Sequence, residues 1–265
     1  MAAFSFEKVE GLGNDFIVVD VQRESDLDPA LVPRLCDRHF GVGADGVLLV
    51  LPPSAGGVAR MRVRNADGSV PEMCGNGLRC VAHHVAERAG WPEGELLIET
   101  DAGPRLCKVS RAPTGADVDV DMGVVRVLEK KSLEIAGISL ELTLVDAGNP
   151  HAIAYREDPA HELPVVGPRL AIHPSFATGT NVELVRWVGP LLEVHVWERG
   201  VGPTLACGTG ACAVVAMACA RGEAPSGSPV RVRLPGGDLL VTHDAATGRT
   251  SMLGPARRVF RGTWA

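Results

Sequence analysis

Residues 205–213 read Leu-Ala-Cys-Gly-Thr-Gly-Ala-Cys-Ala, and residues 73–77 repeat the core of this stretch as Met-Cys-Gly-Asn-Gly. Each stretch places a cysteine, Cys207 or Cys74, directly before a Gly-x-Gly turn that leads into an apolar, alanine-rich run. Thr209 and Asn76 stand two residues after these cysteines and belong to the types that cap helix N-termini. The sequence therefore predicts a helix that opens from the turn after each cysteine, with Asn76 or Thr209 in the capping position.

The start of a helix is a distinctive chemical environment for these thiols. Backbone N–H groups converge there and the helix dipole is positive, which lowers a cysteine pKa from about 8.5 toward neutrality. The same N–H groups, at Gly75-Asn76 and Gly208-Thr209, form a receptor for a carboxylate. Two such thiols in one chain predict a site that acts on one substrate from two sides.

Length and composition narrow the class of protein. A chain of 265 residues with 46% hydrophobic residues is globular, with one large domain or two of moderate size. The net charge of −6 argues against nucleic-acid binding. We find neither an apolar run long enough to span a bilayer nor a signal peptide. The odd count of seven cysteines favours a reducing, cytoplasmic environment over a disulfide framework.

The two halves of the chain repeat one order of features. The matched features are Gly13-Asn14 with Gly148-Asn149, the turn into a strand at 43–47 with that at 179–183, and the spacing of nine residues from Asn65 to Cys74 and from Glu198 to Cys207. Helix and strand patterns interleave in both halves, which favours a mixed α/β fold. We infer an internal duplication into two α/β domains, at 1–115 and 116–255, with the active site in the cleft between them.

Two helices can be followed in detail. The first carries an apolar stripe from Leu78 to Ala89 and ends at Gly90. We expect His83 and His84 to lie on its solvated face. The second, 211–220, is apolar almost all round and should be deeply buried.

Each candidate residue also has an ordinary structural interpretation. Free cysteine is often buried, so Cys74 and Cys207 taken singly are compatible with packing roles. Their shared context favours a functional pair. Zinc binding would need further ligand pairs that the sequence lacks, so no metal is expected. Glu198-Arg199 is compatible with a surface ion pair and Asn149-Pro-His151 with a plain turn, but we prefer functional roles for both.

The motifs resemble those of the diaminopimelate epimerase family, in the family's order and from Phe4 to about Pro255. The matching blocks are Gly11-Leu-Gly-Asn-Asp-Phe16, Arg64-Asn-Ala-Asp-Gly-Ser69, Glu72-Met-Cys-Gly-Asn-Gly77 with Arg79-Cys80, Gly148-Asn-Pro-His151, Asn181-Val-Glu183, Glu198-Arg-Gly200, Ala206-Cys-Gly-Thr-Gly-Ala211 and Leu234-Pro-Gly-Gly237. The resemblance implies two pseudo-symmetric domains, each a mixed sheet curled around a central helix, with the tail 256–265 returning to the first domain.

The resemblance also implies an activity. Family members interconvert LL- and meso-diaminopimelate without a cofactor, on the route to lysine and the peptidoglycan cross-link. The implied roles have Cys207 take the proton from the LL isomer and Cys74 return one, while His151 and Glu198 help to set the protonation of the thiols. The family further suggests a homodimer.

Residues that bind the substrate follow from the resemblance and from the chemistry of a second amino-acid group at the far end of the substrate. Its carboxylate needs hydrogen-bond donors, and its ammonium group needs an acceptor. Suitable donors are Asn65, Asn149, Asn181 and Arg199, and Glu198 is a suitable acceptor. Asn14 carries over from the family as a further binding residue.

Three positions depart from the family pattern. Gly46 stands where many members carry a substrate-contacting Gln, and Pro71 and Pro203 replace other residues before the two cysteine blocks.

Three other functions stay open. The alternatives are a proline or hydroxyproline racemase (or a related isomerase) of the same fold, a dithiol redox protein and a binding module for small amino acids. The usual close spacing of redox cysteines argues against the redox protein.

Overall fold

The computed structural model describes residues 3–71, 74–91 and 93–265, so Glu72 and Met73 of the first cysteine block lie outside the described residues. The chain divides into two compact units, one of residues 1–120 with 254–265 and one of residues 121–253. We call them unit 1 and unit 2. The chain leaves unit 1 within strand β7 (Ala116–Val124) and returns within strand β16 (Arg249–Trp264). That each unit is a separate domain stays a prediction.

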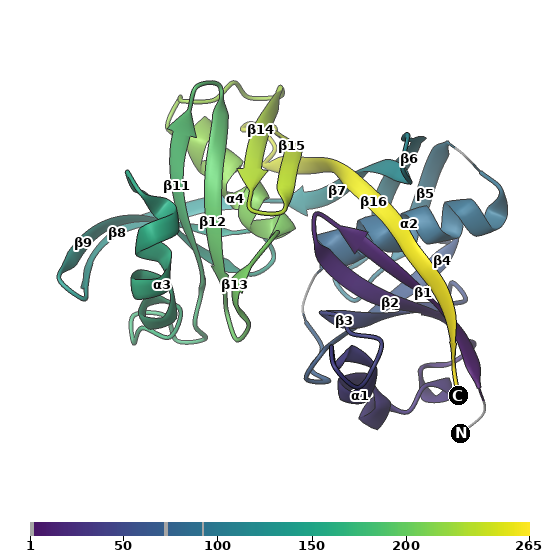
Figure 1. Ribbon diagram of the computed structural model, residues 1–265. Coiled ribbons are helices and arrows are strands. Elements are labelled where there is room, and N and C mark those ends of the chain that lie inside the picture. The colour runs from purple at the N-terminus through teal and green to yellow at the C-terminus, as the bar shows by residue number, and fades with distance from the viewer. Residues whose placement is uncertain (1–2, 72–73, 92) are drawn as a thin grey trace. The chain divides into compact units, whose positions relative to one another are not determined.

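Unit 1 is a mixed sheet built on one long helix (Figure 1). Besides β7 and the end of β16, its elements are β1 (Phe4–Gly11), β2 (Asn14–Asp20), η1 (Glu24–Asp26), η2 (Pro29–Leu31), α1 (Val32–Cys36), β3 (Gly46–Leu51), β4 (Ala59–Asn65), α2 (Gly75–Ala89), β5 (Gly94–Glu99) and β6 (Arg105–Arg111). Strands β1 to β7 are neighbours in chain order, and β16 pairs with both β1 and β7. The path of strands therefore closes, and α2 packs against β1 to β6.

Unit 2 repeats this plan around a second helix. Besides the start of β16, its elements are β8 (Arg126–Ile135), β9 (Ile138–Asp146), β10 (Pro150–Tyr155), α3 (Pro159–Leu170), β11 (Asn181–Val188), β12 (Leu191–Glu198), β13 (Gly202–Thr204), α4 (Gly208–Ala220), β14 (Pro229–Leu234) and β15 (Gly237–His243). Their order in the sheet is β8-β9-β10-β11-β12-β14-β15-β16, with β13 beside β12. Helix α4 packs against strands of this sheet, including β8, β11 and β15.

The sense of strand pairing confirms the internal repeat. In unit 1, β2 is parallel to β3, β3 antiparallel to β4, and β4 parallel to β5. In unit 2, β10 is parallel to β11, β11 antiparallel to β12, and β12 parallel to β14. The central helix follows the third strand of each series, α2 after β4 and α4 after β12. The predicted mixed α/β fold, with a sheet around one central helix in each half, is confirmed.

Helices α2 and α4 begin directly after the two cysteines, and their N-caps are Cys74 and Cys207 rather than the predicted Asn76 and Thr209. The backbone of Cys74 is extended and its sulfur accepts the N–H of Gly77, so the thiol itself caps the helix, while Gly90 ends α2 in the left-handed conformation. Helix α4 is buried from Gly208 to Ala218, as its apolar composition predicts. Removing one of its large side chains from water contributes about 1.5–3 kcal/mol of stability.

Two expectations about helices were wrong. His83 and His84 are buried rather than solvated, and His84 bridges Glu7 at 2.8 Å and Asp20 at 3.1 Å. Helix α3 has no counterpart in the sequence-based prediction, because two prolines lie inside it. Its apolar stripe of Leu163, Val166 and Leu170 is buried, and tertiary packing thereby outweighs its poor helix propensity.

The C-terminal strand ties unit 1 together. Phe4 pairs with Trp264, so the first and last strands lie side by side (Figure 1). The fully buried Arg79 of α2 donates from Nε to the carbonyl of Pro255 at 3.2 Å. Over the described ranges, no helix has the length and apolar character needed to cross a membrane.

Candidate active site

Unit 1 presents Cys74 at the N-terminus of α2. The backbone N–H of Gly77 donates to its sulfur at 3.2 Å, and a Cβ on Gly77 would lie 3.0 Å from that sulfur. A side chain on Gly77 would therefore crowd the sulfur where it lies against the first helical turn. Within the described residues, the N–H of Gly75 has no partner, which leaves a donor beside the thiol.

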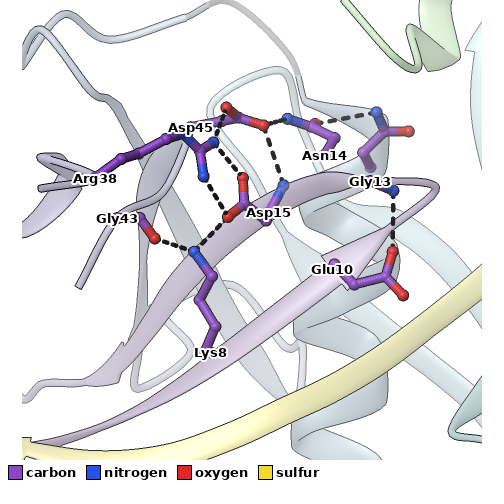
Figure 2. Close-up of polar contacts among 9 residues, drawn as sticks. Lys8, Glu10, Gly13, Asn14, Asp15, Arg38, Gly43 and Asp45 are labelled. Atoms are coloured by element: carbon purple, nitrogen blue, oxygen red, sulfur yellow. Dashed lines mark hydrogen bonds and ion pairs between the residues drawn. The ribbon is translucent and has the colours of Figure 1, made fainter. Parts of the chain in front are cut away.

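Asn14 and Asn76 form a linked pair beside this helix start. Asn76 is buried, and its Nδ2 donates to Asn14 Oδ1 at 3.0 Å. The Nδ2 of Asn14 donates in turn to Asp45 Oδ2 at 2.7 Å (Figure 2). These contacts fix which end of the Asn14 amide faces which neighbour.

A charged network supports Asp45. Arg38 donates to Asp45 Oδ1 at 2.7 Å and to both carboxylate oxygens of Asp15, and Lys8 bonds to Asp15 and to the carbonyl of Gly43 (Figure 2). Burial alone would raise the pKa of Asp15, but the contacts with Arg38 and Lys8 outweigh it and lower that pKa. Asp15 is therefore ionised and holds both cations in place.

Asn65 ends strand β4 and lies opposite Gly46 in the antiparallel register. Its Nδ2 donates to Ser69 Oγ at 2.9 Å across the following turn. A Cβ on Gly46 would lie 2.6 Å from the carbonyl oxygen of Arg64, so this backbone leaves no room for the glutamine that many family members carry. The close pairing of β3 with β4 therefore requires a residue without a side chain at position 46, where many family members carry glutamine.

Unit 2 presents Cys207 at the N-terminus of α4 in the same way. Its sulfur accepts the N–H of Gly210 at 3.4 Å and lies 3.5 Å from Thr209 Oγ1. Among described residues, the N–H groups of Gly208 and Thr209 have no partner. Both predicted carboxylate receptors therefore keep donors at the helix start.

The expectation of a lowered pKa at Cys207 was wrong. Its burial raises the pKa well above the usual value, and the nearby carboxylates of Glu198 and Glu183 raise it further. The hydrogen bonds with Thr209 and Gly210 act in the lowering direction but are outweighed. Cys207 is consequently a thiol at neutral pH, because loss of solvation opposes a buried thiolate more than the helix start favours it.

Glu198 and Arg199 occupy the end of β12 and the turn beyond it. Glu198 Oε1 accepts the hydroxyl of Thr204 at 2.6 Å. Arg199 donates from Nη1 to the carbonyl of Thr178, and its backbone N–H donates to Asn181 Oδ1 at 2.9 Å. Since the buried Asn181 also donates from Nδ2 to the carbonyl of Pro150, its amide links two loops of unit 2 and keeps one N–H for other partners.

The His151 ring is buried, and each of its two nitrogens lies within hydrogen-bond distance of an oxygen atom. Its Nδ1 lies 2.7 Å from Glu183 Oε1, and its Nε2 lies 2.8 Å from Asn149 Oδ1. The side chains of His151 and Glu183 are both 0% exposed. The half-buried Asn149 has no partner for its Nδ2 among the described residues, so this group is available to a ligand.

The structure thus gathers the predicted residues into two sets. Unit 1 brings together Cys74, Gly75, Asn76 and Asn14, with Asn65 at the end of β4; unit 2 brings together Cys207, Gly208 and Thr209, and links Asn149 to His151 and Asn181 to Arg199. Sequence reasoning missed Asp45 and Glu183 as partners of Asn14 and His151. The available signals were an aspartate inside a Gly-rich turn and a lone carboxylate in an apolar strand.

Comparisons with known proteins identify relatives over nearly the whole chain. The family model described as diaminopimelate epimerase matches residues 6–128 and 143–259. The chain is 42% identical over 282 residues to a diaminopimelate epimerase of Synechocystis sp., covering 98% of both chains. It is 41% identical over 280 residues to that of Heliobacterium modesticaldum, covering 97% of this chain and 98% of the relative.

Solved structures at much lower identity share the fold. A hydroxyproline epimerase from Agrobacterium vitis superposes with a TM-score of 0.77 at 15% identity, covering 98% of this chain and 92% of the other. A phenazine biosynthesis protein of the PhzF family from Bacillus anthracis gives 0.77 at 16% identity, with both chains fully covered. The same two-part α/β fold therefore occurs in proteins with different names.

Proposed function

The chain belongs to the diaminopimelate epimerase family, and on this premise we propose that Cys74 and Cys207 are the acid–base pair of a cofactor-independent epimerisation between LL- and meso-diaminopimelate. The observation that carries the proposal is the matched placement of the two cysteines. Each is the N-cap of the central helix of its unit, and each sulfur accepts the N–H three residues ahead.

The reaction itself requires two groups of this kind. The α-hydrogen of an amino acid is very weakly acidic, and inversion of the centre needs a base on one face and an acid on the other. A thiolate takes the α-proton and forms an S–H bond, while the C–H electron pair stays on the α-carbon and spreads into the carboxylate. The thiol on the opposite face then delivers its proton to that carbon. The product centre is inverted, and the two sulfurs have exchanged roles.

Stabilisation of the carbanion is assigned to the helix starts. The N–H groups of Gly75, Gly208 and Thr209 are suited to hold the reacting carboxylate and the charge that develops on it. In the proposed roles, Cys207 takes the proton of the LL isomer and Cys74 returns one. Because Cys207 is a thiol in the ligand-free protein, the form that is ready to act on LL substrate is the minor one.

We assign recognition of the distal amino-acid group to residues around the two cysteines. Asn65, Asn149 and Arg199 are donors for its carboxylate, and Glu198 is an acceptor for its ammonium group. Asn14 and Asn76 support the first helix start, and Asn181 holds the turn that carries Arg199. His151 and Glu198 help to set the protonation of Cys207 in this assignment.

Proton NMR of LL-diaminopimelate in heavy water tests the reaction. We expect loss of one α-proton signal together with appearance of the meso isomer. Cys74→Ala and Cys207→Ala should each abolish turnover, because either change removes one of the two proton carriers. Cys219→Ala is the matched control, since that half-buried thiol lies near the end of α4 and its one hydrogen bond with a described residue is to the carbonyl of Pro225.

The outcomes separate the alternatives. Full turnover in either alanine variant of the pair would exclude the two-base mechanism. Exchange with proline or hydroxyproline, and none with diaminopimelate, would keep the two thiols and replace the substrate. No exchange with any of them would favour the dithiol redox protein.

We also propose a cytoplasmic homodimer, from the reducing environment that the cysteines indicate and from the family. Light scattering of the purified protein tests the assembly, and a mass near that of one 27.9 kDa chain would contradict it. Fractionation of cells tests the localisation.

A further inference from the structure

A row of three polar side chains crosses two parallel strands of unit 2. Glu183 comes from β11, while His151 and Asn149 come from the start of β10 and the residue before it. Glu183 Oε1, the His151 ring and Asn149 Oδ1 are joined by contacts of 2.7 and 2.8 Å. The row begins at a fully buried carboxylate and ends at a half-buried amide, so it connects the interior to an accessible group.

Both neighbours of the His151 ring are hydrogen-bond acceptors. A carboxylate oxygen and an amide oxygen accept, and a neutral imidazole donates from only one nitrogen. Both contacts are satisfied when the ring carries two protons, and the negative charge of Glu183 stabilises that form. A neutral ring would donate to Glu183 and present a lone pair to Asn149, and the Asn149 amide would then have to turn over.

A ring that carries both protons would fix which end of Asn149 is accessible. With Oδ1 accepting from His151 Nε2, the Nδ2 group has no partner among the described residues and stays available as a donor. In unit 1 the counterpart of Asn149 is Asn14. Its amide has the same orientation, because Asn14 Oδ1 also accepts from a protein side chain, Asn76 Nδ2, at 3.0 Å. In both halves of the duplicated chain, a protein donor therefore occupies the carbonyl end of the Gly-Asn amide.

The surroundings of Glu183 are unfavourable for stability alone. Its Oε2 is buried and has no hydrogen-bond partner among the described residues, and its Oε1 would lie 2.7 Å from a Cβ on Gly210. A buried charge with an unsatisfied oxygen lowers stability, so a contribution to stability does not explain why a carboxylate lies here. The carboxylate nevertheless lies directly behind the ring that bonds to Asn149.

We propose that Glu183 is a positioning residue that, through His151, keeps the Nδ2 group of Asn149 directed at the substrate carboxylate. The inference rests on the proposed function, in which Asn149 binds that carboxylate. It adds the group that determines the orientation of the amide. Glu183 and His151 need not touch the substrate for this role.

Glu183→Gln tests the proposal while nearly preserving shape. Without the carboxylate charge the ring carries one proton, which either nitrogen can hold because the glutamine amide both donates and accepts. The Asn149 amide is then no longer held in one orientation, and in part of the molecules its oxygen faces the substrate carboxylate. We expect KM for LL-diaminopimelate to rise severalfold, because a hydrogen bond to a charged group is weakened, and kcat to change much less. Glu193→Gln is the matched control: it removes a carboxylate 3.0 Å from the His195 ring on β12, and KM should not change.

Two further readouts distinguish positioning from general structural damage. Nitrogen-15 NMR, assigned with His151→Gln, should show two protons on the His151 ring in the wild type and one in Glu183→Gln. In an Asn149→Ala background, Glu183→Gln should have no further effect on KM, because the two residues act in series.

A singly protonated ring in the wild type, an unchanged KM or additive effects in the double variant would each overturn the proposal. If Glu183→Gln does not fold, Glu183→Asp withdraws the carboxylate by one methylene, and the same rise in KM is expected. If the wild type exchanges no α-proton of diaminopimelate, the proposed function fails. The ring measurement then still decides whether Glu183 controls His151.

Discussion

The reactivity of Cys207 gives the most direct test of the electrostatics of the site. A thiol with an ordinary pKa of 9.0 is about 3% thiolate at pH 7.5, and each unit of upward shift reduces this fraction tenfold. Burial, Glu198 and Glu183 all raise the pKa of Cys207. In the folded protein at pH 7.5, iodoacetamide should therefore alkylate Cys207 at less than about one tenth of its rate in the denatured chain.

The Glu198→Gln variant distinguishes the effect of Cys207 ionisation on the alkylation rate from the effect of limited access of iodoacetamide to the sulfur. Removal of one nearby negative charge lowers the pKa of Cys207, so alkylation should become faster while the sulfur stays buried. Mass spectrometry of the peptide that contains Cys207 measures the rate, with Glu193→Gln as the variant expected to react like the wild type. If Glu198→Gln leaves the rate unchanged, or if folded and denatured protein react equally fast, the account of the raised pKa is refuted.

Three further predictions concern stability. Gly46→Gln should lower the free energy of unfolding by about 1–3 kcal/mol, because its Cβ would lie 2.6 Å from the Arg64 carbonyl oxygen; an unchanged urea midpoint would show that the strand moves freely. Backbone N–H donors lower the pKa of Glu99 to about 2, so its contribution is present above the ordinary value of 4.5 and is lost as the pH falls from there to about 2. The wild type should lose its advantage over Glu99→Gln in that interval, and a constant difference between their urea midpoints would contradict this. Burial lowers the pKa of His84, but the hydrogen bonds that its ring donates to the carboxylates of Asp20 and Glu7 outweigh burial and raise the pKa above 6.5. The stabilisation by His84 is therefore present below pH 6.5 and is lost as the pH rises through the higher folded value, so thermal melts of wild type and His84→Gln should converge there.

The local sequence was sufficient to predict those features of the fold that depend on residues close together in the chain. The Gly-x-Gly turn and the apolar stripe predicted that α2 follows Cys74 and ends at Gly90, although its N-cap is Cys74 itself and not Asn76. Uniform apolarity predicted that α4 is buried. The local sequence failed at α3, where burial of one face outweighs the cost of Pro164 and Pro168, and at His84, whose partners lie on β1 and β2. These outcomes depend on contacts between segments that are distant in the chain.

Some features of the candidate site could likewise be predicted from the sequence, and others depend on contacts made in the folded chain. The two matched cysteines, the duplicated order of motifs and the mixed α/β fold could be predicted from the sequence, because each is recorded in residue types at fixed spacing. The contacts of Asp45 with Asn14 and of Glu183 with His151, and the raised pKa of Cys207, became evident from the three-dimensional structure alone. Hydrogen bonds across strands and loss of solvation arise when the chain packs, and residue spacing does not encode them.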